Sequence, residues 1–246
     1  MKPILFTFLL LTALWGSSCR KTADIDPIEV ETPTDTTEYT DDMHSSAPGF
    51  GNSVARPQGA LFVYPAGIRV IGKPTKEFEC LSEAIFQKRV IGSGGAVNFC
   101  ISFQNTTDSP IKIEFPPKTV WIAEKLSTQN GITLKWIRLL IPARSTVVYN
   151  LNAFCINSAR SPTDYLEHYE GQPVVSNHAN LNELVQLVAG KKFDFDDYGG
   201  YSLEYAASEA YQKAFIAGQI ATANVAHEGR LTTEARQRIA ALPDIK

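Results

Sequence analysis

Residues 57–160 carry the alternation of apolar and polar positions that is typical of β-strands. Val97, Phe99, Ile101 and Phe103 alternate with polar residues or a cysteine, so this strand has one apolar face. Turn formers separate it from its neighbours, and the strands and short apolar runs predicted in this way are 67–71, 90–91, 97–104, 111–115, 119–123, 132–141 and 146–156. Because no helical pattern stands between them, we expect an antiparallel β-sandwich.

One dipeptide inside this region predicts a specific connection. Asn130-Gly131 stands between the apolar runs 120–122 and 132–141. Asn-Gly is the strongest short signal for a β-hairpin, because both residues accept the positive φ of a tight turn. A hairpin between these two runs is therefore expected.

After Pro162 the apolar period becomes helical. Asn180 followed by Glu183 predicts a capped helix start, and Gly190 predicts the end of that helix. A second helix is expected from about Ser202 to Ala226, and a short third one is expected before Pro243. The second carries the apolar positions Leu203, Ala206, Ala210, Phe215, Ala217, Ala221 and Val225.

These helices are too apolar to stand alone, so we expect them to pack on the sandwich. The predicted fold class is α+β, an antiparallel Ig-like sandwich over residues 57–160 with a helical C-terminal part over residues 161–246. Gly218, inside the long helix, is expected where another element approaches closely.

The N-terminus has the order of features found in a secretion signal. Met1-Lys2 is positive, residues 4–15 are apolar, and small residues precede Cys19. The small residues and the cysteine resemble the lipobox of bacterial lipoproteins, which implies a signal peptide over residues 1–18 and an acylated Cys19. The alternative is an ordinary signal cleaved near Cys19, with this cysteine in a disulfide. The apolar run is too short to span a bilayer.

An acidic segment follows, and we expect residues 19–56 to be a disordered tether. Residues 22–55 hold eight acidic residues and no Lys or Arg, with Pro and Thr between them. Such a composition buries too little apolar surface to offset the entropy of ordering. The remaining residues 56–246 hold 20 basic and 18 acidic residues, which excludes the electrostatic pattern of a nucleic-acid-binding protein.

The four cysteines are expected to have three roles: lipid attachment, a disulfide and one remaining thiol. With Cys19 taken by lipid, Cys80, Cys100 and Cys155 remain, an odd number in an oxidising compartment. Regular strands place Cys155 on an apolar face and Cys100 on a polar face, which disfavours pairing these two. The preferred disulfide is Cys80–Cys100, although sequence does not fix connectivity. Cys155 is then either a buried, unreactive thiol or a thiol with a chemical role.

Several short motifs carry a resemblance to a known group of proteins. They are Asn105-Thr-Thr, Phe115-Pro-Pro, Gln129-Asn-Gly131, Phe154-Cys-Ile-Asn157, Arg160-Ser-Pro162, Gly190-Lys-Lys192 and the C-terminal Leu242-Pro243. In this order they resemble uncharacterised secreted lipoproteins of Gram-negative bacteria. The resemblance covers about residues 95–243 and implies a β-sandwich with C-terminal helices in the cell envelope. It implies no activity.

Two of the motifs are also similar to bacterial thioester adhesin domains. These are the aromatic-Cys pair at Cys155 and the Gln-x-Ala motif at Gln219. In such domains a Cys thiol and a Gln side chain form an internal thioester that captures amines on a host surface. The resemblance therefore implies a Cys155–Gln219 thioester. Ala223 and Phe215 stand where that family has tryptophan.

Other chemistry finds little support in the sequence. The four histidines lack zinc-ligand spacing. The segment from Asp194 resembles a calcium loop, but Tyr198 and Tyr205 stand at positions where such a loop needs ligands. We therefore expect no metal or cofactor. A Gly-x-Ser-x-Gly elbow is missing. Cys155 with His168 or His178 is the remaining nucleophile–base combination. The aromatic candidates for a binding surface are Trp121, Trp136, Tyr165, Tyr169, Tyr198 and Tyr201, although both tryptophans are more typical of a core.

These observations favour a binding or adhesion module without catalytic activity, held by lipid at the outer membrane. Its ligand is an unidentified protein or glycan, and nucleic acid is not expected. A covalent adhesin that uses Cys155 and Gln219 is the main alternative, and an envelope hydrolase is the third.

Overall fold

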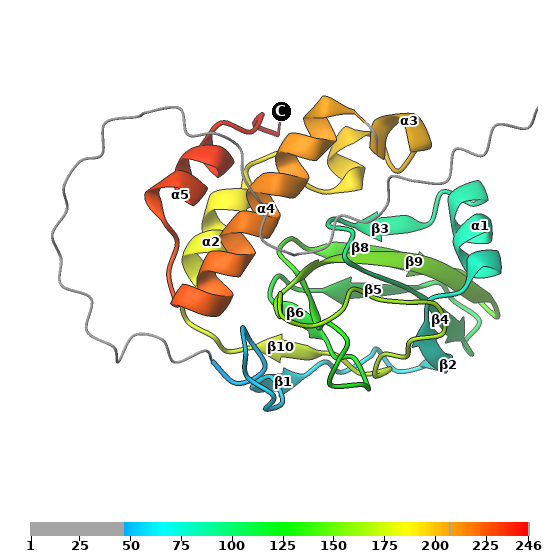
Figure 1. Ribbon diagram of the computed structural model, residues 1–246. Helices are drawn as coiled ribbons and strands as arrows, with labels where there is room; N and C mark the ends of the chain where they lie inside the picture. The colour runs from blue at the N-terminus through cyan, green and yellow to red at the C-terminus, as the bar shows by residue number, and fades with distance from the viewer. Residues whose placement is uncertain (1–46, 207, 246) are drawn as a thin grey trace, which may run out of the picture.

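Three layers make up the part of the chain that the computed structural model describes, residues 47–206 and 208–245 (Figure 1). A large, mostly antiparallel sheet forms the middle layer. The C-terminal helices cover one of its faces, and a small two-stranded sheet packs on the other face. The fold is α+β, as expected. The signal segment, Cys19 and most of the acidic tether lie outside the described residues.

The large sheet is built around one long strand. Its strands are β1 (Gly59–Leu61), β2 (Ile68–Thr75), β3 (Val90–Gly92), β4 (Val97–Asn105), β6 (Thr119–Trp121), β7 (Gly131–Thr133), β9 (Thr146–Cys155) and β10 (Val174–Ser176). They run in the order β1-β10-β6-β7-β9-β4-β2, and β3 pairs with β9 in parallel. Strand β9 pairs with β4 along most of its length and with β7 only at its last two residues. It therefore joins the two halves of the sheet.

The second sheet covers the most aromatic part of the interior. It consists of β5 (Ile111–Phe115) and β8 (Ile137–Ile141), paired antiparallel. Beneath it, Phe99 lies with its ring centroid 5.4 Å from Trp121 and 4.3 Å from Tyr169. The alternation along β4 predicted this face, because Val97, Phe99, Ile101 and Phe103 are all fully buried here.

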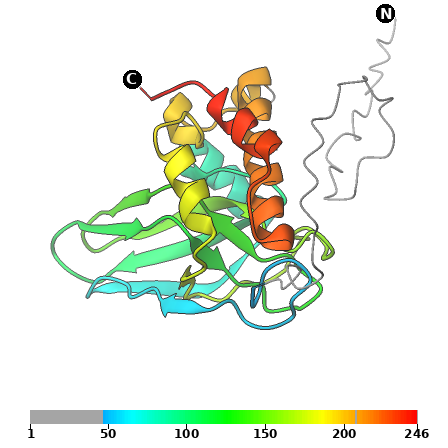
Figure 2. The ribbon, with the colours of Figure 1, turned by 90° about the vertical axis from the view of Figure 1, so that its left-hand side faces the viewer.

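The helices lie together on the opposite face of the large sheet (Figure 2). They are α2 (Leu181–Ala189), α3 (Leu203–Ala206), α4 (Glu209–Glu228) and α5 (Thr233–Ala240), with the 3-10 helix η2 (Phe195–Tyr198) before α3. Phe154 and Ile156 of the β9 region share a buried cluster with side chains of α2, α4 and α5. The expected docking of helices on the sheet is therefore present. The long helix predicted over 202–226 is two helices, α3 and α4.

Gly218 permits the close approach that its position predicts. A Cβ at this residue would lie 2.5 Å from ring atoms of both Phe154 and Phe193. Only a hydrogen at this position lets α4 pack directly on the two buried rings.

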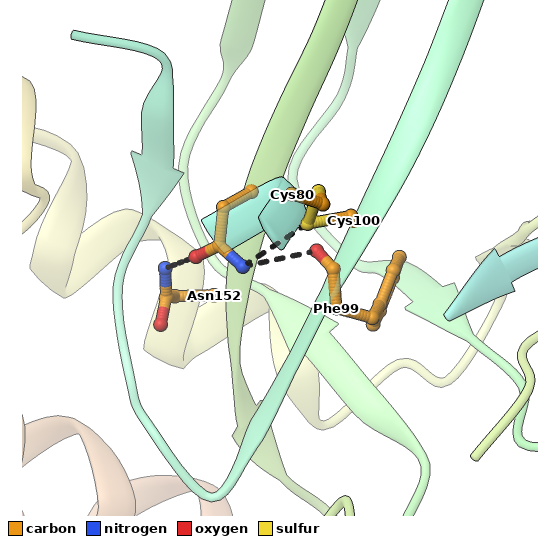
Figure 3. The surroundings of a disulfide bond; sticks show 5 residues. Cys80, Phe99, Cys100 and Asn152 are labelled. Atoms are coloured by element: carbon orange, nitrogen blue, oxygen red, sulfur yellow. Dashed lines mark hydrogen bonds between the residues drawn. A yellow bond between two sulfur atoms is a disulfide. The ribbon is translucent and has the colours of Figure 1, made fainter. Parts of the chain in front are cut away.

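Helix α1 (Phe78–Phe86) interrupts the run of strands, where the sequence pattern predicted none. Its first turn holds Cys80, which forms a disulfide with Cys100 of β4, the pairing that the sequence favours (Figure 3). Beside the disulfide, the Asn152 side chain donates to the Asn150 side-chain oxygen at 3.0 Å. Ala84 is the fully buried residue of α1, whereas Phe78 and Phe86 are exposed.

Two predicted signals are correct in place but not in detail. The hairpin expected between 120–122 and 132–141 is present, because β6 and β7 pair antiparallel, but Asn130-Gly131 is not its turn, since Gly131 already belongs to β7 and pairs with Trp121. The connection runs from Ile122 to Asn130, and the Asn130 side chain supports it by accepting a hydrogen bond from the Ala123 N–H at 3.0 Å. Helix α2 begins after Asn180 and ends before Gly190, as expected, but the Asn180 side chain makes no capping hydrogen bond, and Glu183 instead pairs with Arg236 of α5.

The described chain also departs from the expected segment boundaries. Gly49, Phe50 and Gly51 are buried against the fold, and Phe50 is 1% exposed, so packed structure begins earlier than residue 57. Strand β10 lies in the segment expected to be helical, and it joins β1 to β6. Burial of a phenylalanine and backbone pairing across the sheet, neither visible as a local pattern, cause both differences.

Candidate functional site

Cys155 and Gln219, which are 64 residues apart in the chain, meet at the end of β9. The Cys155 backbone N–H donates to Gln219 Oε1 at 3.2 Å, and Gln219 Nε2 donates to the Cys155 carbonyl oxygen at 3.1 Å. The side-chain amide of Gln219 therefore binds both backbone polar atoms of Cys155. This contact links α4 directly to the last residue of the central strand.

The topology explains why this backbone edge needs a partner. On one side Cys155 pairs with Gly131 of β7. On the other side β4 begins at Val97, opposite Ala153, so the strand ladder ends before it reaches Cys155. An unsatisfied buried N–H or C=O costs about 1–3 kcal/mol, and the Gln219 amide supplies the donor and acceptor of a missing strand residue.

The Cys155 thiol is buried on the opposite face from the helices. Leu151, Ala153 and Cys155 alternate along β9 with Phe154, which packs under the helices. Gly131 lies directly across from Cys155, where a Cβ would meet Val97 and Ala153. Cys155 is 1% exposed and is not part of the disulfide.

An unusual set of buried polar residues surrounds this end of the strand. Its members are Thr128, Gln129, Asn130, Asn157 and Thr163, each no more than 4% exposed. The Tyr169 hydroxyl lies 2.6 Å from Thr163 Oγ1 and donates to the Gln129 carbonyl at 3.0 Å. Burial raises the pKa of Tyr169 above its usual range, and the electrostatic influence of Cys155 acts in the same direction. Gln129, Asn130 and Asn157 belong to motifs of the resemblance, but no local pattern indicated that the set is buried together, because its members come from two separate loops.

Arg160 lies close enough to Cys155 for the two groups to interact electrostatically. Burial lowers the pKa of the Arg160 guanidinium, and the nearby Cys155 opposes that effect. Its Nη2 donates to the Ser53 carbonyl at 2.7 Å, and its own carbonyl accepts from Gln129 Nε2 at 2.9 Å.

A second contact ties the same two segments together. The Ser158 hydroxyl and His227 Nε2 lie 2.7 Å apart, joining the turn after β9 to the last turn of α4. Burial lowers the pKa of His227, so its ring is neutral at neutral pH. Sequence spacing did not indicate this pair, because 69 residues separate its members.

The Gln219 amide makes two contacts of a kind that acyl transfer uses. Its carbonyl oxygen already accepts from a backbone N–H, which is the kind of donor that stabilises a developing oxyanion. Its nitrogen, which would leave as ammonia, donates a hydrogen bond to the Cys155 carbonyl oxygen. A bond between Cys155 Sγ and Gln219 Cδ would close a small ring around the existing N–H to O contact.

The other residues considered for chemistry are occupied elsewhere. His178 packs edge-on against Phe50, with ring centroids 5.1 Å apart, and His168 forms a backbone bridge with Thr75. Asp194 is buried and accepts from the Ser93 hydroxyl at 2.8 Å, and burial raises its pKa to about 7. Within residues 47–206 and 208–245, no cluster of His, Cys, Asp or Glu has the makings of a metal site.

The aromatic candidates divide between core and surface. Trp121 and Tyr169 are fully buried, whereas Trp136 and Tyr165 are exposed. Arg138 lies over the Trp136 ring, 5.6 Å from its centroid, on the outer side of β8. Two surface hollows measure about 60 Å³ and 190 Å³. Both are smaller than typical small-molecule sites.

Comparison with protein-family models, with curated proteins and with solved structures gave no match to this chain. In the described part of the chain, no helix has the length and apolar character needed to cross a membrane.

Proposed function

We propose that this chain is a cell-envelope adhesion module that attaches to its target covalently, through an internal thioester between Cys155 and Gln219. The observation that carries the proposal is the pair of hydrogen bonds between the Gln219 amide and the Cys155 backbone. They hold the acyl group of Gln219 against the residue whose thiol would attack it. The thioester-domain-like character of the sandwich belongs to the same proposal.

The proposed chemistry has two balanced steps. In the first, Cys155 Sγ attacks Gln219 Cδ, the C–N bond breaks, and ammonia leaves with the thiol proton. In the second, an amine of the target attacks the thioester carbonyl and forms an amide with Gln219, which returns the Cys155 thiol. In both steps the Cys155 N–H stabilises negative charge on the same oxygen. The reaction consumes the site once, so the protein is not an enzyme.

Intact mass tests the first step. The purified chain is expected to weigh less than the sum of its residues by one ammonia, beyond the loss from its disulfide, and incubation with methylamine is expected to add one methylamine. Cys155→Ala and Gln219→Ala should each abolish both mass changes. A native mass below the residue sum only by the two hydrogens of the disulfide, with Cys155 fully alkylated after denaturation, would rule the thioester out.

A matched glutamine separates chemistry from folding. Gln212 stands on the same helix and binds the Ala206 carbonyl at an exposed position. Gln212→Ala should keep the mass deficit, whereas Gln219→Ala loses it. Gln219→Ala should also lower the free energy of unfolding by about 1–3 kcal/mol, because two buried backbone groups lose their partner.

The membrane attachment rests on Cys19 in the same proposal. An acyl chain contributes about 0.8 kcal/mol for each buried CH₂, and several chains together anchor a protein firmly. Cys19→Ala should move the protein from the detergent phase to the aqueous phase in detergent partitioning. A variant that stays with the membrane fraction would contradict the anchor.

A non-covalent binding module is the second candidate, and the outer side of β8 favours it. Trp136, with Arg138 stacked over its ring, and Leu140 present exposed apolar surface beside a cation. Aromatic and arginine side chains are the common anchors of binding surfaces for proteins and glycans. In this case Gln219 only completes the sheet edge, and Trp136→Ala rather than Cys155→Ala abolishes adhesion to target cells.

A further inference from the structure

Four large, mainly apolar side chains lie exposed where three segments of the chain meet. They are Phe78, Leu126, Tyr165 and Leu166, each more than half exposed. Phe78 begins α1, Leu126 belongs to the β6–β7 connection, and the other two belong to the connection between β9 and β10. We call these four residues the loop patch. Exposed apolar residues that gather in one place mark an interaction surface, whereas single ones do not.

Leu166 is held in a backbone conformation that leucine disfavours. Its φ is +62°, in the left-handed region. Its N–H donates to the Lys76 carbonyl at 3.0 Å, two residues before Phe78. This conformation costs free energy, and the exposed Leu166 side chain recovers none of it in the core. Such an outlier points to a role outside the packing of the fold.

The β6–β7 connection lies against the same segment. Ala123 and Tyr169 form an antiparallel backbone bridge. The Glu124 N–H donates to the His168 carbonyl at 2.9 Å, one residue further along both chains. Leu126 follows two residues later. Three segments that are distant in sequence therefore present their apolar side chains together.

The surroundings of the loop patch favour a soft apolar occupant. Lys73 Nζ lies 2.8 Å from Glu124 Oε2, and Lys125 Nζ lies 2.7 Å from Glu167 Oε1, so the lysines beside it are paired. Neither of the two surface hollows is lined by residues of the loop patch. Exposed side chains on loops, one of them an amphipathic tyrosine, with lysine stems around them, suit the headgroup region of a lipid bilayer.

The chain enters the fold close to one of these loops. Arg160 Nη2 donates to the Ser53 carbonyl at 2.7 Å. The next residue, Ser161, forms a backbone bridge with Thr128 of the β6–β7 connection. Residues 19–46 join the proposed lipid anchor to the fold, and at about 3.4 Å per residue they span at most about 95 Å. The anchor would keep the loop patch within reach of the bilayer.

We propose that the loop patch is a second contact with the phospholipid bilayer, in which its four side chains insert between the lipid headgroups. The acyl chains on Cys19 hold the protein at the membrane, and the loop patch sets the orientation of the fold. The nearness of the bilayer rests on the proposed lipid anchor. The insertion itself concerns the folded part and is measured without the anchor.

The test uses residues 20–246, which lack the signal segment and Cys19 but keep every described residue. They should sediment with vesicles of phosphatidylethanolamine and phosphatidylglycerol, and high salt should not release them, because the neighbouring lysines are paired. Leu166→Gly should weaken vesicle binding about tenfold. It should leave the urea midpoint nearly unchanged, because relief of the strained φ offsets the freedom that glycine adds to the unfolded chain.

Leu140→Ser is the matched control and should keep vesicle binding. Leu140 is 61% exposed but lies on β8, away from the loop patch. Vesicles with brominated acyl chains then report the orientation. They should quench the fluorescence of Leu166→Trp but not that of the native chain, whose exposed Trp136 precedes β8.

Equal vesicle binding by Leu166→Gly and Leu140→Ser, or no binding by residues 20–246, would overturn the proposal. So would a dimer in solution that Leu166→Gly dissociates, because the loop patch would then bind a second copy of the chain. If Leu166→Gly does not fold, Phe78→Ser removes another exposed side chain of the same patch. Failure of the anchor is seen separately: the native chain stays in the aqueous phase in detergent partitioning, while vesicle binding by residues 20–246 still decides the insertion.

Discussion

Two tightly enclosed residues, Gly218 and Asp194, lie at contacts between the layers of this protein. Gly218 lies against the rings of Phe154 and Phe193, and Asp194 is a carboxyl group enclosed between η2 and the sheet. The sequence indicated the first, because a glycine inside a helix needs a reason. It did not indicate the second, because the burial of Asp194 depends on Ser93, which is 101 residues away.

Gly218→Ala should destabilise the protein although alanine is the better helix former. The added Cβ would lie 2.5 Å from two buried rings, and overpacking of this kind costs about 1–3 kcal/mol. That exceeds the gain in helix propensity of about 1 kcal/mol. Urea unfolding measures the difference. Gly190→Ala, where a Cβ meets nothing within 4 Å, is the control and should be neutral or stabilising.

Asp194 should make the protein less stable as pH rises. Its pKa is about 7 in the folded protein because of burial, whereas an unfolded aspartate has a pKa of about 3.9. The folded state therefore holds the proton more tightly, and the free energy of unfolding falls between about pH 4 and pH 7. Asp194→Asn should remove this component, on the order of a few kcal/mol, and be more stable than the native chain at pH 8.

Unfolding of both chains at pH 5 and pH 8 measures that effect. Identical pH profiles for the native chain and Asp194→Asn would show that Asp194 stays ionised when buried.

Among the elements, strand positions followed the sequence more closely than connections did. The alternation in β4 and β5 is local, so their strands and inward faces could be read directly. Helix α1 carries two exposed phenylalanines and little regular apolar pattern, so the sequence did not predict it. The pairing of Cys155 with Gln219 was suggested by resemblance alone, and its hydrogen-bond geometry required the fold, because the end of β4 at Val97 creates the vacant sheet edge.

Reduction of the disulfide should loosen α1 more than any other element. The bridge closes a loop with a sequence separation of 20, and Ala84 is the fully buried residue of the helix. Loss of such a crosslink costs about 3 kcal/mol. Hydrogen exchange with and without dithiothreitol measures it, and α1 amides should exchange fastest after reduction. Uniform acceleration over the whole chain would show that α1 is not an independent unit.

At the scale of the whole molecule, sheet and helices share one interior. The cluster under the helices contains Phe154 of β9 together with Leu184 of α2 and Val225 of α4. Hydrogen bonds of Gln219 and His227 also connect α4 to the end of β9. Separation of the two parts would expose this surface, so we expect one cooperative unit.

Leu184→Ala should therefore lower a single unfolding midpoint. Leu184 is fully buried, and such substitutions cost about 2–5 kcal/mol. Tryptophan fluorescence reports on the sheet through Trp121, and far-ultraviolet circular dichroism reports mainly on the helices. The two signals should shift together. A shift in the helical signal alone would define a separate helical domain.

The position of residues 47–53 has a mechanical consequence for the proposed attachment. Through the hydrogen bond from Gly51 to Ile156, this segment lies at the same end of β9 as Gln219, the proposed point of covalent attachment. Under the proposed lipid anchor and thioester, a pulling force between membrane and target would enter and leave the fold at neighbouring points. Release of the chain from Ala47 to Pro57 would lengthen the linkage by at most about 35 Å at 3.5 Å per residue. The linkage would therefore extend before the layers of the fold bear the load.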